Sequence, residues 1–472
     1  MKRNFIFKLF VLLTVSLSSC KDFLIVDPKS SLSENQMFES EVGFQQALTG
    51  VYSQLASRNL YGDNLSMGFV SALAQNYAAA SSGSPFYRTK QFNYDYAEVR
   101  SYLNQIWNNA YSSIAGANKI IANADLKKSM LSPQSYALLK GESLAIRALL
   151  HFDLLRLFGK SFAENPNAKA IPYKKTVDEF AVVPSTTAEI ITLVLEDLKA
   201  AEDLLKPYDG VLDDISPRRH KLNYWAVKGL EARVNMYAGN KNEAYQAAQE
   251  VVNSGKFVFV AAEDAGASEA FRDRLYLSEL LFCIRPTNLD TWVENIYFRY
   301  RSGTTTNLLR SEAQFKVLFE TSNGGGASDY RYAYGINNNG SNSVTTKYWQ
   351  TYYFKDLTDY KLDRLVPIIR LSELYYIMAE CTENPTLALQ YLNQIRSARA
   401  LTPLFSQNSD ANYIQSELQK EYQKEFYAEG QTFWYYKRKQ VKRMQFMTSD
   451  FDTKKYVLPI PNDELEFNPN YN

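Results

Sequence analysis

The sequence contains few of the residues on which metal, redox and nucleophilic chemistry most often depend. Among 472 residues there are three cysteines and two histidines. Three cysteines cannot build a disulfide framework. His151 and His220 stand in no HExxH or paired Cys/His spacing, and no serine near them carries a catalytic motif. We therefore expect no metal site, no cofactor and no catalytic residue.

The chain also lacks an excess of charge of either sign. It carries 52 lysines and arginines against 51 aspartates and glutamates, and no basic block stands out. A protein that binds nucleic acid needs a basic surface to neutralise phosphates. We therefore expect no nucleic acid partner.

Long apolar runs are missing too, apart from one at the N-terminus. Lys2 and Arg3 precede a mostly apolar stretch, residues 5–17, which is short for a membrane-spanning helix and typical of an export signal. Leu17-Ser-Ser then leads into Cys20, as in a bacterial lipoprotein processing box. This pattern predicts a signal peptide over residues 1–19 and an acylated Cys20 that anchors the chain in a membrane. The alternative is an ordinary signal peptide followed by a cysteine by chance.

Helical periodicity is strongest near residues 367–400. Leu371, Leu374, Tyr375 and Met378 recur at i, i+3, i+4 and i+7, and the same spacing resumes after Pro385. Two amphipathic helices back to back fill about 34 residues, the length of one tetratricopeptide-type unit. A second pair is predicted over residues 222–252. An ordinary helical bundle is the alternative to a repeat scaffold, and both are α.

Further helices are predicted over residues 38–55, 102–124, 133–158 and 186–207, with Ser132-Pro133 and Thr186 placed to cap two of them. Residues 60–96 are rich in Gly, Ser and Ala without sustained periodicity, so we expect a long surface excursion. Residues 256–365 have no repeating helical period either. The predicted fold is mostly α, a tetratricopeptide-like helix-pair scaffold with a long irregular region of loops and short strands laid over it.

Several motifs along the chain resemble those of one family. They are Cys20-Lys-Asp-Phe-Leu with Asp27-Pro28, Ala47-Leu-Thr-Gly-Val-Tyr52, Val366-Pro-Ile-Ile-Arg370-Leu-Ser-Glu373, Leu392-Asn-Gln-Ile-Arg396 and Leu458-Pro-Ile-Pro461. Their order resembles the SusD/RagB family of outer-membrane nutrient-binding lipoproteins over essentially the full chain. The chain departs from the family pattern at Glu421-Tyr-Gln, where Glu-Arg is commoner, and at Tyr435-Tyr436.

This resemblance implies a signal peptide over 1–19 and one domain over 20–472. Its scaffold would cover about 38–255 and 366–440, with a ligand-binding region over about 256–365. It also implies an outer-membrane, lipid-anchored, cell-surface protein that captures oligosaccharides and delivers them to a SusC-like TonB-dependent transporter. A peptide ligand, as in proteins of the RagB type, and a structural transporter lid without its own ligand are the alternatives.

The abundant aromatic residues are the candidates for ligand contact. Aromatics make up 14% of the chain, with 34 tyrosines, and their flat rings can stack on sugars or peptides. Those in polar, Gly/Ser/Asn-rich surroundings have no helical spacing to bury them. We expect a stacking platform from Tyr77, Phe86, Tyr87, Trp292, Tyr330, Tyr332 and Trp349, with hydrogen bonds from Asn76 and Arg88. Asp329 and Arg331 are weaker candidates, since their match to a family pattern indicates a structural pair.

Carboxylates in series raise the question of hydrolysis. Glu421, Glu425 and Glu429 lie at i, i+4 and i+8 and would share one helix face, and Glu373 and Glu380 nearly do. Carboxylate pairs hydrolyse glycosides when they flank a substrate in a cleft. Here arginines and lysines lie nearby in strongly patterned helices, which favours ion pairs between helices. For the same reason we expect Glu142 and Arg147 to be paired charges within a helical layer, and we expect no enzyme.

Overall fold

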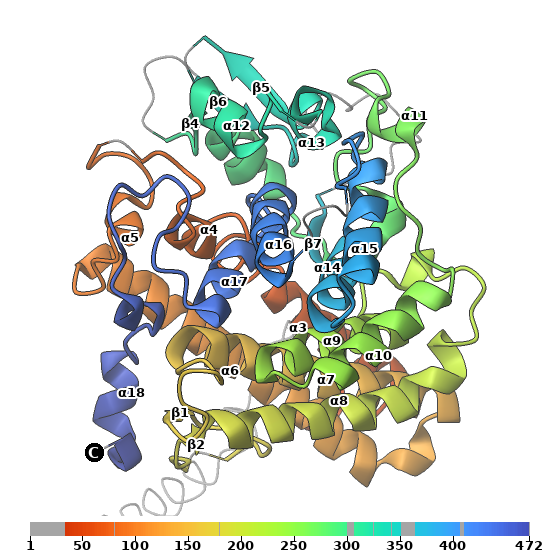
Figure 1. The fold of residues 1–472 in the computed structure, drawn as a ribbon. Helices are drawn as coiled ribbons and strands as arrows, with labels where there is room; N and C mark the ends of the chain where they lie inside the picture. Colours follow the sequence, from red (N-terminus) through yellow and green to blue (C-terminus); the bar gives the residue numbers. More distant parts are fainter. Residues whose placement is uncertain are drawn as a thin grey trace, which may run out of the picture.

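The structure, a computed structural model, describes residues 34–79, 81–178, 180–299, 306–323, 325–340, 342–350, 364–405 and 410–471. Figure 1 shows long helices in the lower half, a central block of upright helices and a cap of short strands and helices at the top. The predicted signal peptide and Cys20 lie outside the described residues. No helix among the described residues is long and apolar enough to cross a membrane.

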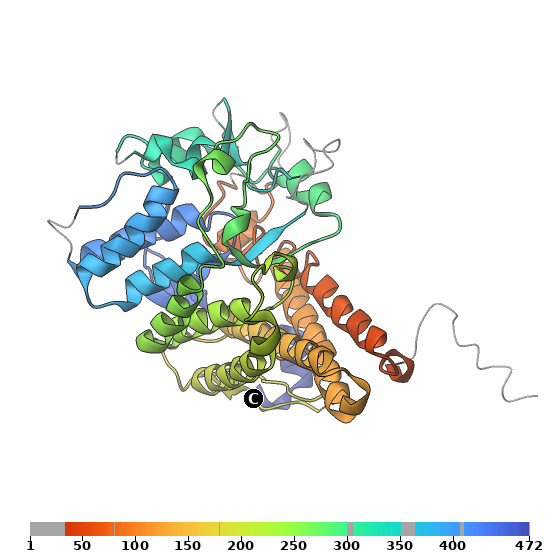
Figure 2. The same ribbon diagram turned by 90° about the vertical axis from the view of Figure 1, so that its right-hand side faces the viewer.

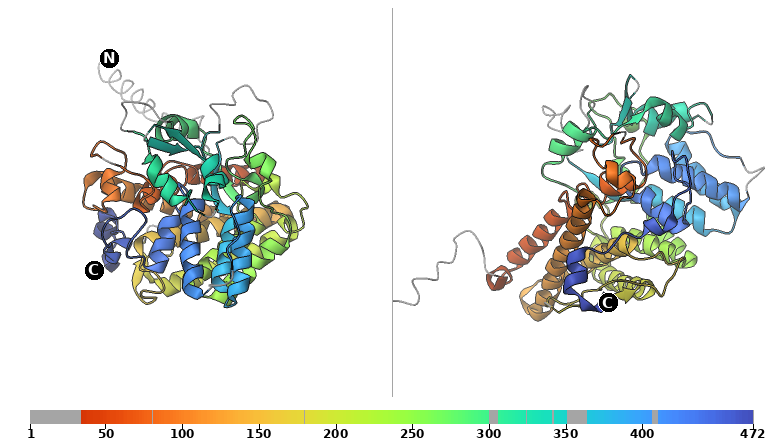
Figure 3. Two further views of the ribbon diagram at one scale, coloured as in Figure 1. Left: turned by 45° about the horizontal axis from the view of Figure 1, so that its top comes forward. Right: turned by 90° about the vertical axis from the view of Figure 1, so that its left-hand side faces the viewer.

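The lower layer is built from α3 (Glu41–Leu55), α6 (Ala97–Leu126), α7 (Pro133–Phe158) and α8 (Thr187–Asp209). α7 packs on the other three and is buried along almost its whole second half, because neighbours cover every side of it. Figure 3 shows α3 and α6 side by side as two long rods. The predicted caps are confirmed: Ser132 accepts a hydrogen bond from the Ser135 amide, and Thr186 and Glu189 form a capping box.

The upstream helix pair is confirmed as α9 (Tyr224–Ala238) and α10 (Lys241–Asn253). Asn223 caps α9 through the Ala226 amide, and Gly239 ends it at φ +80°, a conformation that glycine adopts without strain. Figure 2 shows the blue helices α14 to α17 as one block beside this green pair. The scaffold is therefore a stack of helix pairs, as the periodicity predicts.

The second pair is α14 (Leu371–Cys381) and α15 (Pro385–Ala398), with the predicted Asn384 cap in place. One detail of the prediction is wrong: residues 366–370 are not helical but form the strand β7 (Val366–Arg370), which pairs antiparallel with β3 (Leu280–Ile284). Pro367 disfavours a helical conformation at the residue before it, and the β-branched run suits a strand buried along its whole length.

The region over 60–96 also departs from the expectation of a surface excursion. It contains α4 (Phe69–Leu73) and α5 (Tyr87–Lys90), and every residue from Leu60 to Tyr77 is buried. Small residues let this segment enter the core, where its polar groups bond to one another. The Ser71 hydroxyl, for example, donates to the Ser66 carbonyl at 2.6 Å. Low periodicity here marks an irregular core segment.

The irregular region is confirmed as loops and short elements. A small sheet in the order β4 (Arg310–Ser311), β6 (Asn342–Thr345) and β5 (Ile336–Asn339) lies with α12 (Glu312–Leu318) and α13 (Tyr330–Ala333) at the top of Figure 1. α11 (Ala262–Ala265) and a π-helical turn, Asp290–Tyr297, complete this cap. The fold class is therefore the predicted one.

The C-terminal part of the chain returns to the scaffold through three helices, α16 (Ala411–Glu425), α17 (Gln431–Lys439) and α18 (Asn462–Phe467). Three small elements lie at the periphery: α2 (Glu34–Met37) and the paired strands β1 (Lys169–Ile171) and β2 (Ser185–Thr186). α16 ends at Glu425, and the chain turns through Ala428 and Gly430, which both have positive φ. Glu429 therefore lies beyond the helix, and its predicted place on a shared helix face is wrong.

Candidate functional site

The carboxylates of α16 form a buried ionic layer. Glu425 accepts ion pairs from Arg331 at 2.9 Å, Arg370 at 2.6 Å and Arg399 at 2.7 Å. Burial alone would raise the pKa of Glu425, but the three guanidinium groups hold it well below the usual range. Glu421 also pairs with Arg331, at 2.9 Å. The predicted ion pairing between helices is confirmed, because both carboxylates form ion pairs with more than one arginine.

Two other predicted charges are also paired, each with a different partner. Glu142 pairs with Arg218 at 2.7 Å and accepts a hydrogen bond from the Tyr52 hydroxyl at 2.8 Å. Arg147 binds both carboxylate oxygens of Asp197, at 2.6 and 2.7 Å. Both sites tie α7 to its neighbours, so their function is structural.

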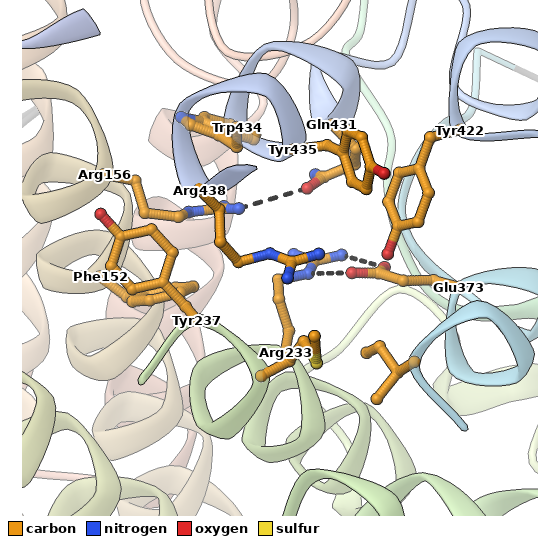
Figure 4. Close-up of a pocket in the computed structure, with 12 residues that line it drawn as sticks. Phe152, Arg156, Arg233, Tyr237, Glu373, Tyr422, Gln431, Trp434, Tyr435 and Arg438 are labelled. Carbon is orange, nitrogen blue, oxygen red and sulfur yellow. Dashed lines mark hydrogen bonds and ion pairs between the residues drawn. The ribbon is translucent and has the colours of Figure 1, made fainter. Parts of the chain in front are cut away.

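Figure 4 shows a pocket between the helix pairs that is lined by charged and aromatic side chains. It has a volume of about 360 Å³ and brings Arg156, Arg233 and Arg438 together with the rings of Trp434 and Tyr435. Figure 4 shows the Arg233 guanidinium facing Glu373, to which it donates two hydrogen bonds of 2.6 Å. Its arginines are ion-paired and its lining is almost entirely buried. We therefore assign this pocket to the core packing between helix pairs and not to ligand capture.

Glu380, which pairs with the pocket residue Arg438, should make the stability of the fold depend on pH. It accepts two hydrogen bonds of 2.7 Å from Arg438, and although burial raises the pKa of Glu380, Arg438 and Lys439 lower it to about 2. The unfolded carboxyl has a pKa near 4.5. The ionised Glu380 therefore stabilises the folded state fully above pH 4.5, and this stabilisation is lost as the pH falls towards 2. It amounts to on the order of 3 kcal/mol in total.

We expect Glu380→Gln to lower the free energy of unfolding at pH 7, since it leaves Arg438 without its carboxylate partner. Denaturant titrations at several pH values should show the gap between the two proteins closing between pH 4.5 and 2. A gap that does not change with pH over that range would contradict a depressed pKa at Glu380.

Among the described histidine and cysteine side chains, His151 and Cys283 are buried, and the Cys283 sulfur lies 3.4 Å from Nδ1 of His220. Burial lowers the pKa of His151 to about 3, and its ring stacks on Tyr173 with a centroid distance of 3.9 Å. Burial raises the pKa of the Cys283 thiol to about 12, which keeps it protonated. Among the described residues, no group of three or more His, Cys, Asp and Glu side chains could hold a metal ion.

The structure buries four of the seven aromatic residues predicted to stack on ligand. Tyr77, Phe86, Trp292 and Trp349 are between 2% and 8% exposed. The Tyr77 hydroxyl donates to the Met67 carbonyl at 2.5 Å, and the Trp349 indole donates to the Phe298 carbonyl at 2.7 Å. The expectation that polar surroundings would leave these rings free is wrong, because the loops that carry them form part of the core.

The residues predicted to donate or accept hydrogen bonds to a ligand are also partly buried as a set: three are buried and one is partly exposed. Asn76 is buried and its side-chain oxygen accepts from the Ala428 amide at 3.3 Å. Asp329 and Arg331 pair with each other at 2.7 Å inside the ionic layer, consistent with a structural pair. Arg88 remains partly exposed and lies on α5. Of the hydrogen-bonding candidates, Arg88 is therefore the one that a large ligand can reach.

Around Arg88 the structure forms a small aromatic stack at the surface. The Arg88 guanidinium carbon lies 5.2 Å from the ring centre of Tyr87 and 5.1 Å from that of Tyr96, a residue that is 45% exposed. Phe86 adopts φ +60° and buries its ring, so it anchors the turn from which Tyr87 and Arg88 project. The sequence prediction did not include Tyr96 among the site residues. Tyr96 is the N-cap residue of α6, and no motif in the sequence distinguishes it.

Arg58 makes a second guanidinium–ring contact. The Arg58 guanidinium sits 5.2 Å from the Trp292 ring centre, and its side chain is 54% exposed. Arg58 also pairs with the buried Asp63 at 3.0 Å, and burial raises the pKa of Asp63 to about 6 although Arg58 lowers it. No motif around Arg58 distinguishes it in the sequence, so only the fold identifies it.

Ring contacts join these two groups. Phe86 lies 6.1 Å from Tyr297, centre to centre, and the Tyr297 hydroxyl donates to Asp63 at 3.0 Å. We call the set Arg58, Tyr87, Arg88, Tyr96 and Trp292 the Arg58/Arg88 patch. It draws on three segments that are distant in sequence, around residues 58, 87–96 and 292, and it contains three of the predicted site residues, Tyr87, Arg88 and Trp292.

Tyr330 and Tyr332 lie elsewhere. Both belong to α13 and are partly exposed, and Tyr332 packs on Phe319 with a centroid distance of 5.6 Å. In Figure 1, α5 lies at the left of the molecule and α13 in the cap at the top. The predicted platform is therefore not one surface, and the binding role of each partly exposed member stays a prediction.

Comparisons with known proteins agree with this fold. Residues 22–235 match the family model SusD-like_3, described as starch-binding associating with outer membrane, and residues 283–472 match the model of the SusD family. A curated relative, SusD-like protein P25 of Formosa agariphila, is 24% identical over 251 residues, which is 52% of this chain and 45% of that protein. The chain thus matches under half the length of that relative.

Two solved structures show the same architecture. A SusD superfamily protein from Bacteroides thetaiotaomicron aligns with a TM-score of 0.72 and 24% identity, over 91% of this chain and 98% of its own. A laminarin binding SusD-like protein aligns with a TM-score of 0.63 and 18% identity, also over 91% and 98%. At such identities these likenesses establish the fold alone. Since the two SusD models between them account for most of the chain, the protein is a member of the SusD family.

Proposed function

We propose that this protein is a cell-surface glycan-binding lipoprotein that captures oligosaccharides at the Arg58/Arg88 patch. One observation carries the proposal: the solvent-reachable guanidinium groups of Arg58 and Arg88 are held against aromatic rings, at 5.1 to 5.2 Å, and the rings of Tyr87 and Tyr96 beside Arg88 are at least partly exposed. Rings stack on the apolar face of a pyranose, and fixed guanidinium groups donate hydrogen bonds to its hydroxyls. Neither contact requires a catalyst.

Family membership supports a proposal for the wider role. Members are described as starch-binding and associated with the outer membrane, and one similar structure is of a laminarin-binding protein. We propose that an acylated Cys20 anchors this chain at the outer membrane, facing outwards, and that it passes its ligand to a SusC-like TonB-dependent transporter. Its ion-paired carboxylates favour binding over hydrolysis.

A peptide ligand and a purely structural lid are the two competing functions. Arginines stacked on rings would also hold a peptide carboxylate, so the patch alone does not separate a glycan from a peptide. A structural lid would bind neither. Isothermal titration of the purified chain with laminarin, other neutral glycans and mixed oligopeptides separates the three.

We expect Tyr87→Ala and Arg88→Ala each to weaken glycan binding about tenfold, because aromatic stacking is worth about 1 to 3 kcal/mol in the nucleobase case and a similar order should hold for sugars. Their melting temperatures should stay near that of the wild type, since neither side chain is part of the core. Lys199→Ala is the matched control: its side chain is 64% exposed and pairs with Asp203 at 2.9 Å on α8, in the lower layer of helices. Unchanged binding in both patch variants would contradict the site, and binding of peptides alone would contradict the ligand.

A further inference from the structure

A broad groove runs along α15, apart from the Arg58/Arg88 patch. It has an empty volume of about 1220 Å³, the open mouth included, and one wall is the helix face formed by Gln390, Asn393, Gln394 and Ser397. The facing wall includes Phe259 and Tyr330. In Figure 1, α15 lies on the right and α5 on the left. We call this feature the α15 groove.

The helix wall presents amides at a regular spacing. Gln390, Asn393, Gln394 and Ser397 lie at i, i+3, i+4 and i+7, so they share one face of α15. The amide of Asn393 is held in place by Leu404, whose N–H donates to it at 2.7 Å and whose carbonyl accepts from it at 3.0 Å. Gln390 and Gln394 are exposed and make no side-chain hydrogen bond to any residue in the described part of the chain. Their donors and acceptors are available to a ligand.

The opposite wall supplies ring faces that are fixed from behind. Tyr330 packs on Tyr334 with a centroid distance of 5.6 Å and an interplanar angle of 31°. Phe259 packs on Tyr375 at 4.9 Å. Both rings remain partly exposed at the groove. Rings positioned in this way lose little conformational freedom when a flat ligand stacks on them.

The charge of the lining selects the ligand class. None of the described residues that line the groove is Asp, Glu, Lys or Arg, although 22% of the chain is charged. A peptide with charged termini or a uronic acid polymer would leave its charges without partners here. Amides, a hydroxyl and ring faces instead complement a polyhydroxylated, uncharged ligand.

We infer that the α15 groove is a second glycan-binding site, which takes a neutral oligosaccharide segment. The inference rests on the proposed function, since it assigns the protein a glycan ligand, but it uses a different surface. Two separated sites on one chain allow a long polysaccharide to be held at two points, and the second contact then forms at a high effective concentration.

The groove is tested with the full chain in detergent, with laminarin oligosaccharides as the neutral probe and oligogalacturonates as the anionic probe. Gln394→Ala and Tyr330→Ala should each weaken one of two classes of binding site for the neutral probe by about tenfold. Gln46→Ala, at an exposed glutamine of α3, is the matched control and should change nothing. Gln394→Glu is a second variant that keeps the helix and should also weaken the neutral probe, because the carboxylate loses the amide donors.

The outcomes separate the two proposals. Wild-type affinity and stoichiometry in the groove variants, with weaker binding in Tyr87→Ala, overturns the groove and leaves the proposed function standing. Loss of a site in the groove variants, with wild-type binding in Tyr87→Ala, supports the groove and overturns the patch. Tighter binding of the anionic probe at the groove overturns its assignment to neutral glycans.

Discussion

Glu425→Gln is expected to destabilise the folded protein by on the order of 3 to 5 kcal/mol, the cost of removing one partner from a buried ion pair. Glu425 is 1% exposed and takes guanidinium groups from the cap, from β7 and from the end of α15, through Arg331, Arg370 and Arg399. A neutral amide would leave three buried cations with one fewer counter-charge. The loss should be large because these groups join three parts of the fold.

Urea unfolding at pH 7 measures this loss, with Glu312→Gln as the matched control. Glu312 pairs with Lys316 at 2.8 Å on an exposed turn of α12, where side chains are 35% and 52% exposed, so its loss should cost at most about 0.5 kcal/mol. Equal stabilities of the two variants would contradict a structural role for the ionic layer. A Glu425→Gln protein that keeps its stability but loses a glycan-hydrolysing activity of the wild type would contradict the binding function.

The helical scaffold follows from local patterns that a single sequence carries. The caps at Ser132, Thr186 and Asn384 are short-range hydrogen bonds, so sequence spacing alone locates them. The prediction went wrong at 366–370, where the strand partner, residues 280–284, is distant in sequence. Pairing over such a separation leaves no periodic signal in either segment.

The binding surface was less predictable because burial of a loop ring depends on the rest of the fold. Tyr77 and Tyr87 both lie in Gly/Ser/Ala-rich sequence, yet Tyr77 is 2% exposed against the core and Tyr87 is partly exposed. Arg58 and Trp292 meet across more than two hundred residues. The sequence could name Tyr87 and Arg88 as candidates, but their grouping with Arg58 and Tyr96 is a property of the tertiary structure.

Charge placement distinguishes the two surfaces that we assign to glycans. The Arg58/Arg88 patch combines guanidinium groups with rings, and the α15 groove combines neutral amides with rings. Asp63, whose pKa burial raises to about 6, holds Arg58 at the patch. Protonation of Asp63 below that pH would weaken the ion pair that holds Arg58, whereas none of the described residues lining the groove carries an acidic or basic side chain. Binding at the patch should therefore be the more pH-dependent of the two.

Cys20→Ala is expected to remove the protein from the outer-membrane fraction completely. The predicted lipoprotein box ends at Cys20, whose thiol would carry the acyl chain. Each buried methylene of an acyl chain contributes about 0.8 kcal/mol of membrane affinity, so a multiply acylated cysteine would hold its domain firmly at the membrane. Without the thiol, no acyl chain can be attached at this position.

Fractionation of cells that express each variant measures this effect, and Cys381→Ala is the matched control. The Cys381 side chain is buried beside Met236, with a sulfur–sulfur distance of 3.4 Å, and burial raises the pKa of its thiol to about 12, so its loss should leave the protein at the membrane. Protease added to intact cells should digest the wild type, because the chain is proposed to face outwards. Retention of Cys20→Ala in the outer membrane would contradict the anchor, and a wild type that resists the protease on intact cells, but not after lysis, would contradict the outward orientation.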